Sequence, residues 1–241
     1  MTDRLRRRSV SQSFLLDLLL GQLRDWSAQR PAPTEETRVV DLGGGTGVIA
    51  ISLASLGYGV TVIDPSPDAL ASLERRTRDA GLGGRIRARQ GDAGDLVELI
   101  GRGSADLVIC HRVLEVVDSP AAALDSIADV LVPDGALSLV VSQRRSAVLS
   151  QALAGHLALA RRTWADPDRF DHDQILDLVA AAGLTPSASH GLGAIADHIP
   201  EAMIEAESGA YEELGRLERE ISQDPAFRAL APYLHVFAQP C

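Results

Sequence analysis

Arg38-Val39-Val40-Asp41-Leu42-Gly43-Gly44-Gly45-Thr46-Gly47 is the stretch that decides the fold. A short apolar run ends here in four glycines within five residues, and an apolar helical pattern follows from Val48 onward. This order predicts a buried strand, a tight turn and the first turn of a helix. Glycine accepts positive φ and has no Cβ, so the backbone N–H groups of such a turn can approach a polar or anionic ligand closely.

A second acidic strand end narrows the choice of ligand. Val60-Thr61-Val62-Ile63-Asp64 reads as a strand whose last residue lies 21 positions after Gly43, where a carboxylate can bind ribose hydroxyls. The glycine spacing is G-x-G-x-G and the sixth position is Val48, so the dinucleotide fingerprint G-x-G-x-x-G is not met. A nicotinamide site and a purely structural loop are the alternatives.

The acidic strand end, the glycine turn and the second acidic strand end together resemble the cofactor site of class I methyltransferases that use S-adenosylmethionine (SAM). The resemblance implies that the loop after the third strand flanks the adenine, with Asp92 accepting from its amino group and the N–H of Ala93 facing a ring nitrogen. It also implies that His111 packs along the methionine part. The predicted cofactor residues are Asp41, Gly43, Gly44, Gly45, Gly47, Asp64, Pro65, Asp92, Ala93 and His111.

Strand and helix patterns alternate from residue 38 onward, which predicts an α/β fold. We expect a seven-stranded, mostly parallel Rossmann-like sheet with helices on both faces and an antiparallel last strand. Strands are predicted at 38–42, 59–64, 85–90, 105–110, 135–142, 184–190 and 233–238, and helices at 46–56, 67–81, 93–100, 120–131, 147–160, 172–182 and 199–221.

The predicted organisation is a basic arm and one helix in residues 1–37, followed by a SAM-binding domain in 38–241. A helical insertion at about 196–225 is placed beside the acceptor pocket. In the arm, Arg4, Arg6, Arg7 and Arg8 precede an amphipathic helix, and they are either solvated or part of a lid over an anionic acceptor.

Composition excludes several classes of protein. The net charge is −10 and all 23 basic residues are arginine, which argues against a surface coated for nucleic acid. No apolar run approaches the roughly 18 residues needed to span a bilayer. Two cysteines make no disulfide framework, so we expect a cytoplasmic protein. No unexplained apolar stripe stands out, so the sequence leaves the oligomeric state unknown.

His111 ends the predicted fourth strand, at the edge of the sheet where strand ends deliver side chains to a ligand. Glu115 lies four residues on and would share a helical face with it. Two such side chains do not make a metal site, so no metal is predicted.

A more specific similarity is carried by the runs 111–120 and 131–139, by Arg162-Thr163, and by Ala196-Asp197, Tyr211-Glu212-Glu213-Leu214 and Tyr233-Leu234-His235-Val236. Through these runs the chain resembles the SmtA-like bacterial family over roughly residues 38–239. The best-known members methylate the carboxylate of 5-carboxymethoxyuridine in tRNA. This chain departs from them on the acceptor side: a lysine-rich segment is replaced by 157–161, and a family arginine is replaced by Gly193.

The expected activity is methyl transfer to a carboxylate oxygen, on tRNA or on a small carboxylate metabolite. A carboxylate is already ionised at neutral pH and needs a cationic clamp rather than a base. His111, Arg112 and Arg162 are the predicted catalytic residues, and the arginine candidates for the clamp are Arg8, Arg112, Arg144, Arg145 and Arg162. A hydroxyl or amine acceptor would need a base, for which the candidates are His111, Glu115, Asp197 and His198. A third possibility is a non-catalytic binding module with this fold.

Overall fold

The computed structural model describes residues 10–28, 36–166 and 169–241. A seven-stranded sheet forms its centre, with the strand order β3-β2-β1-β4-β5-β7-β6. The strands run parallel except β7, which pairs antiparallel with both β5 and β6. The predicted fold class is therefore confirmed, including the antiparallel last strand. The strands are β1 (Arg38–Leu42), β2 (Gly59–Asp64), β3 (Ile86–Gln90), β4 (Ala105–His111), β5 (Leu131–Ser142), β6 (Leu184–Leu192) and β7 (Tyr233–Pro240).

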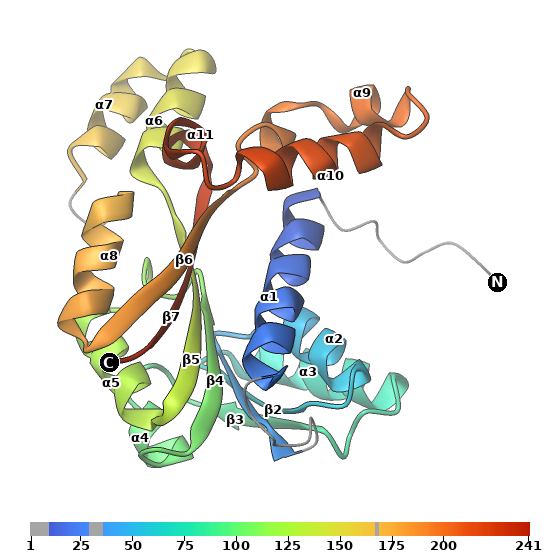
Figure 1. Ribbon diagram of the computed structural model, residues 1–241, viewed down its shortest axis with the longest axis vertical. Helices are drawn as coiled ribbons and strands as arrows, with labels where there is room; N and C mark the ends of the chain where they lie inside the picture. The colour runs from blue at the N-terminus through green and yellow to red at the C-terminus, as the bar shows by residue number, and fades with distance from the viewer. Residues whose placement is uncertain (1–9, 29–35, 167–168) are drawn as a thin grey trace.

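Helices cover both faces of this sheet (Figure 1). Buried residues run almost continuously along the central strands β1 and β4, because successive side chains point to opposite faces and both faces are covered. In β1, Val39 packs into the core under α1 (Val10–Ala28), α2 (Val48–Ser55) and α3 (Pro67–Asp79). Its neighbour Val40 packs into the core on the other face, under α4 (Leu96–Ile100), α5 (Pro120–Val130) and α8 (His172–Ala181).

Two long helices of the prediction are each divided in the structure, because a glycine in the left-handed region interrupts them. The segment 147–160 falls into α6 (Arg144–Leu153) and α7 (Leu157–Trp164), separated by Gly155 with φ +81°. The segment 199–221 falls into α9 (Glu201–Glu205) and α10 (Ala210–Ile221), with Gly209 at φ +84° between them. Neither glycine occupies a helical position, which the apolar pattern did not indicate.

Other helices and strands also differ from the prediction. The predicted helix 93–100 begins only at Leu96, and the short helices η2 (Ala196–His198) and α11 (Pro225–Leu230) were not predicted. β5 begins at Leu131, which pairs with Ala105, and the ladder shifts register before Leu107 pairs with Ala136. The strand predicted at 135–142 is thus longer at its start and irregular there.

The segment between β6 and β7 carries η2, α9, α10 and α11, and α1 packs against both α10 and η2. Figure 1 shows α1 standing between this helical segment and α2. The basic arm of the prediction lies outside the described residues. Across the part of the chain that is described, no helix combines the length and apolar character required to cross a bilayer.

Candidate functional site

Strand register brings the predicted cofactor residues to one edge of the sheet. Leu42 pairs with Ile63 on one side and with Cys110 on the other. One residue further along, Gly43 therefore lies between Asp64 and His111. The turn after β1 and the ends of β2 and β4 form a single continuous edge, which is where ligands bind in open α/β sheets.

Close packing fixes the path of the glycine turn. A Cβ on Gly43 would lie 2.4 Å from a methyl of Val113, and one on Gly47 would lie 2.1 Å from a methyl of Leu73. At Gly44 it would meet the Asp41 carboxylate at 2.6 Å. Neighbouring side chains therefore leave no space for a Cβ at any of these three glycines, and they hold the backbone of the turn in place.

Gly45 differs from the other glycines of the turn, because a Cβ there would meet only the Asp64 carboxylate, at 3.7 Å. The N–H of Gly45 donates to Oδ2 of Asp64 at 2.8 Å, and the N–H of Ser66 donates to Oδ1 at 2.9 Å. The carboxylate thus ties the turn after β1 to the turn after β2. Beside Gly45 the turn is therefore open, with this fixed carboxylate at its edge.

Asp41 is buried beneath the turn, with 3% of its surface exposed. Burial, assisted by repulsion from Asp64, raises the pKa of Asp41 to about 7, although a backbone hydrogen bond at Ala50 acts in the opposite direction. Its Oδ2 atom has no hydrogen-bond partner in the described structure. A buried carboxylate without a full set of partners is costly, and such groups concentrate at functional sites.

The loop after β3 is held by its own side chains. Oδ1 of Asp92 accepts the N–H of Gly94 at 2.7 Å, and the N–H of Asp92 donates to Oδ2 of Asp95 at 3.0 Å. Ala93 is buried, whereas Asp92 is exposed at the surface. Pro65 lies opposite, and its carbonyl accepts from the Gln90 side chain at 3.3 Å. The two loops predicted to flank the cofactor therefore face each other across the ends of β2 and β3.

His111 belongs to a row of buried polar side chains that crosses the sheet. Its Nε2 lies 2.9 Å from Oγ of Ser138, which lies 3.0 Å from Nε2 of His235. Burial lowers the pKa of His111 to about 3, so the ring is neutral. Nδ1 of His111 is also buried and has no partner. One ring nitrogen is thus occupied, and the other is covered by neighbouring atoms.

A cavity of about 410 Å³ adjoins His111 and lies under α1. Most of its wall is apolar, from α1, the first turns of α2 and the ends of β5 and β6. The lining residues are Ser11, Gln12, Leu15, Leu16, Leu19, Val48, Ile49, Ser52, His111, Arg112, Val140, Leu192, Asp197 and Tyr233. Its size is in the range of small-molecule sites.

Arg112 supplies a positive charge to this cavity from an unusual backbone conformation. Its φ is +60°, the one positive value for a residue other than glycine in the described chain. Its N–H donates to the Val140 carbonyl at 2.7 Å, and its guanidinium lies 5.7 Å from the centre of the Tyr233 ring. Backbone strain of this kind costs on the order of 1–3 kcal/mol and gathers at ligand sites.

Asp197 is a carboxylate at the same cavity, and Glu218 supports it. Oδ1 of Asp197 accepts the Ser11 hydroxyl at 2.6 Å, and burial raises the pKa of Asp197. The fully buried Glu218 accepts the N–H groups of Gly193, Ile195 and Ala196 at 3.1, 2.7 and 2.7 Å. Sequence reasoning did not identify this role, because Glu218 falls within an ordinary charged helical pattern.

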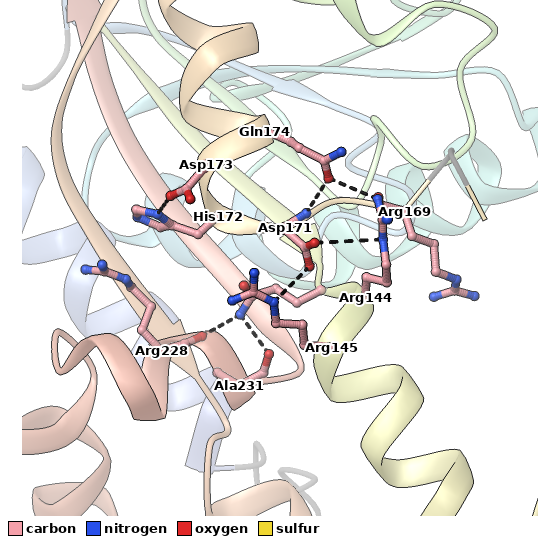
Figure 2. Close-up of polar contacts among 10 residues, drawn as sticks. Arg144, Arg145, Arg169, Asp171, His172, Asp173, Gln174, Arg228 and Ala231 are labelled. Carbon is pink, nitrogen blue, oxygen red and sulfur yellow. Dashed lines mark hydrogen bonds and ion pairs between the residues drawn. The ribbon is translucent and has the colours of Figure 1, made fainter. Parts of the chain in front are cut away.

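Two of the arginine candidates lie away from the cavity, against Asp171 (Figure 2). Arg144 contacts one carboxylate oxygen at 4.0 Å and Arg145 the other at 3.8 Å. Arg144 also donates to the Arg169 carbonyl at 2.5 Å. Both guanidinium groups are therefore engaged by neighbouring residues of the chain.

Two other predicted residues are also separate from the cavity. Arg162 is exposed on α7 and lines a shallow depression with His156 and Leu157. Glu115 is not helical; its Oε1 accepts the N–H of Ser142 at 2.6 Å, which corrects its expected placement on a helical face with His111. Arg8 lies outside the described residues. Among those residues no three His, Cys, Asp or Glu side chains are grouped to hold a metal ion.

Comparison with known proteins identifies the domain. Residues 40–139 match the family described as methyltransferase domain. The tRNA 5-carboxymethoxyuridine methyltransferase of Escherichia coli (strain K12) is 25% identical over 213 residues, covering 85% of this chain and 80% of that protein.

A second similar protein and a similar solved structure are also methyltransferases. The ubiquinone biosynthesis O-methyltransferase of Ralstonia nicotianae is 30% identical over 174 residues, covering 70% of this chain and 71% of that protein. A geranyl diphosphate methyltransferase solved with SAM has the same fold, with a TM-score of 0.61 at 15% identity, over 92% of this chain and 85% of that one. With its sheet order and its glycine turn, the chain belongs to the methyltransferase-domain family and is a class I methyltransferase that uses S-adenosylmethionine.

Proposed function

We propose that this enzyme methylates a carboxylate oxygen of a small acceptor with an apolar body, bound in the cavity under α1. The observation that carries the proposal is the pairing of one arginine with apolar walls at this cavity. Of the candidate arginines in the described residues, Arg112 alone lines it.

SAM supplies a methyl group activated by its sulfonium, so the protein's task is to hold the acceptor close and in line. Arg112 can bind a carboxylate through two parallel hydrogen bonds, which orients it as well as holding it. The Tyr233 ring beneath the guanidinium limits the positions that Arg112 can occupy. Leu15, Leu19 and Ile49 would cover the apolar body of the acceptor.

The state of His111 supports a carboxylate acceptor. A carboxylate has lost its proton at neutral pH, and its methylation requires no base. His111 is neutral, and its Nε2 is already bonded to Ser138. Its role in this proposal is to form a wall of the site and to position its neighbours.

A tRNA acceptor is favoured by the E. coli relative, which aligns with 85% of this chain. Against it, Arg144 and Arg145 are held by Asp171, and the cavity is small and largely apolar. We therefore place a small carboxylate first. A small hydroxyl acceptor is favoured by Asp197, whose raised pKa suits a base, and by the R. nicotianae relative.

The experiment is transfer of tritiated methyl from SAM into a metabolite extract and, separately, into total small RNA. Methyl esters release volatile methanol in mild alkali, whereas methyl ethers and methylamines do not. We expect alkali-labile label in the metabolite fraction, lost on Arg112→Gln and kept in the control Arg75→Gln on α3. Label confined to RNA would overturn the small acceptor, and alkali-stable label lost on Asp197→Asn would overturn the carboxylate.

A further inference from the structure

A second depression, of about 390 Å³, lies on the opposite face of the sheet from α1. It is floored by the first halves of β1, β2 and β3. The register pairs Arg38 with Gly59, and Thr61 with Arg87. Of the helices on this face, α4 borders the depression through Leu99 and Ile100 and has only five residues, so it covers little of the three strands.

Four arginines line this depression: Arg38, Arg85, Arg87 and Arg89. No acidic side chain lines it, although the chain carries 33 acidic residues against 23 basic ones. The last three arginines occupy alternate positions of β3 and its approach, so they point to the same face of the sheet. The groove is thus a concentrated positive site on an acidic protein.

Arg38 is paired with Asp106, whose Oδ2 lies 2.9 Å from its Nε, so the free positive charge comes from the other three arginines. Arg85 donates one N–H to the Gly57 carbonyl at 2.5 Å, and Arg89 donates one to the Leu99 carbonyl at 2.7 Å. Each guanidinium keeps further N–H groups. Within the described structure Arg87 makes no hydrogen bond or ion pair and is exposed. A Cβ built on Gly59 or Gly84 meets nothing within 4 Å, so the floor of the groove is open to a ligand.

Protection of an edge strand does not account for this arrangement. β3 is at the edge of the sheet, and charged residues there discourage pairing with another chain. Such protection needs charges along β3 alone. It does not require Arg85 and Arg89 to be held against neighbouring carbonyls, nor the absence of acidic side chains from the lining of the depression.

We propose that this groove binds a small anion carrying two or more phosphate groups, such as a nucleoside polyphosphate. Guanidinium forks match phosphate oxygens in geometry, and several adjacent charges favour a multiply charged ligand. Leu99 and Ile100, both partly exposed, offer apolar surface for the remainder of the molecule. The groove lies on the face of the sheet away from the cavity that contains Arg112, so both sites can be occupied together.

The test is titration calorimetry with inorganic tripolyphosphate and with ATP, on protein saturated with S-adenosylhomocysteine so that ATP is not scored at the cofactor turn. We expect binding of both, weakened as sodium chloride rises from about 50 to about 200 mM. The Arg85→Glu/Arg87→Glu protein should lose at least about tenfold in affinity. Arg75→Glu/Arg78→Glu on α3 has the same change in net charge and should lose less than about twofold.

A third variant removes space rather than charge. Gly59→Phe fills the floor of the groove and keeps all four arginines, so it should also abolish tripolyphosphate binding. All variants should keep the wild-type affinity for S-adenosylhomocysteine, which verifies their fold. The proposal is overturned by absence of tripolyphosphate binding at about 1 mM, by equal losses in the α3 control, or by an RNA oligomer that binds while tripolyphosphate and ATP do not.

Discussion

Nε2 of His111 lies 2.9 Å from the hydroxyl of Ser138, and the same hydroxyl lies 3.0 Å from Nε2 of His235. A serine hydroxyl has one hydrogen to donate, so it satisfies both rings when one donates to it and the other accepts from it. The tautomer of His235 therefore determines the tautomer of His111 at the cavity. This places Ser138 as a positioning residue for His111.

Ser138→Ala should lower the free energy of unfolding by about 2–4 kcal/mol, because it leaves two fully or largely buried ring nitrogens without a partner. Chemical denaturation measures this loss. Ser208→Ala, at an exposed loop position, is the control and should change stability by less than about 0.5 kcal/mol. A Ser138→Ala protein as stable as the control would show that the hydroxyl does not hold the two rings.

Asp64→Ala should weaken binding of S-adenosylhomocysteine by about tenfold to a hundredfold. The loss of the carboxylate releases the N–H groups of Gly45 and Ser66 and removes a candidate ribose acceptor. Gly45→Arg should have a similar effect by filling the open side of the turn. Titration calorimetry checks both, with Asp68→Ala in the first turn of α3 as a neighbouring control. Wild-type affinity in both site variants would disprove the assignment of the cofactor to this turn.

The sheet and the cofactor edge could be predicted from sequence because both rest on local patterns. Short apolar runs specify strands, and the glycines from Gly43 to Gly47 specify the turn between Asp41 and α2. Parallel alternation then requires that Asp64 and His111 reach the same edge. Strand ends were accordingly predicted well wherever an acidic or polar residue closes an apolar run.

The acceptor side could not be predicted, because its geometry depends on long-range packing. Gly155 and Gly209 fall within apolar helical patterns, yet both take positive φ and end a helix. Contacts such as Ser11 with Asp197, 186 residues apart, leave no trace in sequence spacing. The arginine candidates for the clamp were equivalent in sequence, and only the fold separates Arg112 from Arg144 and Arg145.

The stability of the protein should depend on pH through Asp41. Because the pKa of Asp41 is raised to about 7 in the folded protein, folding favours its protonated form. Its contribution to stability therefore falls as pH rises from 4 towards 7, by up to about 4 kcal/mol, and is constant above 7. Asp41→Asn should gain stability relative to wild type across this interval. Denaturation of the ligand-free proteins at pH 5 and pH 7 tests this, with the exposed Asp125→Asn as the control. If the stability difference between Asp41→Asn and wild type were the same at both pH values, the prediction would be wrong.

Glu218→Gln should destabilise the protein by about 3 kcal/mol, because an amide can no longer accept all three N–H groups of the loop 193–196. One carboxylate oxygen becomes an NH₂ group that faces the N–H of Gly193 or of Ile195 and Ala196. The loop carries Asp197 to the cavity, so the acceptor KM should rise while the affinity for S-adenosylhomocysteine is unchanged. Glu213→Gln, an exposed residue of the same helix paired with Arg216, should cost less than about 1 kcal/mol. If the two variants were equally stable, the buried carboxylate would not be what orders this loop.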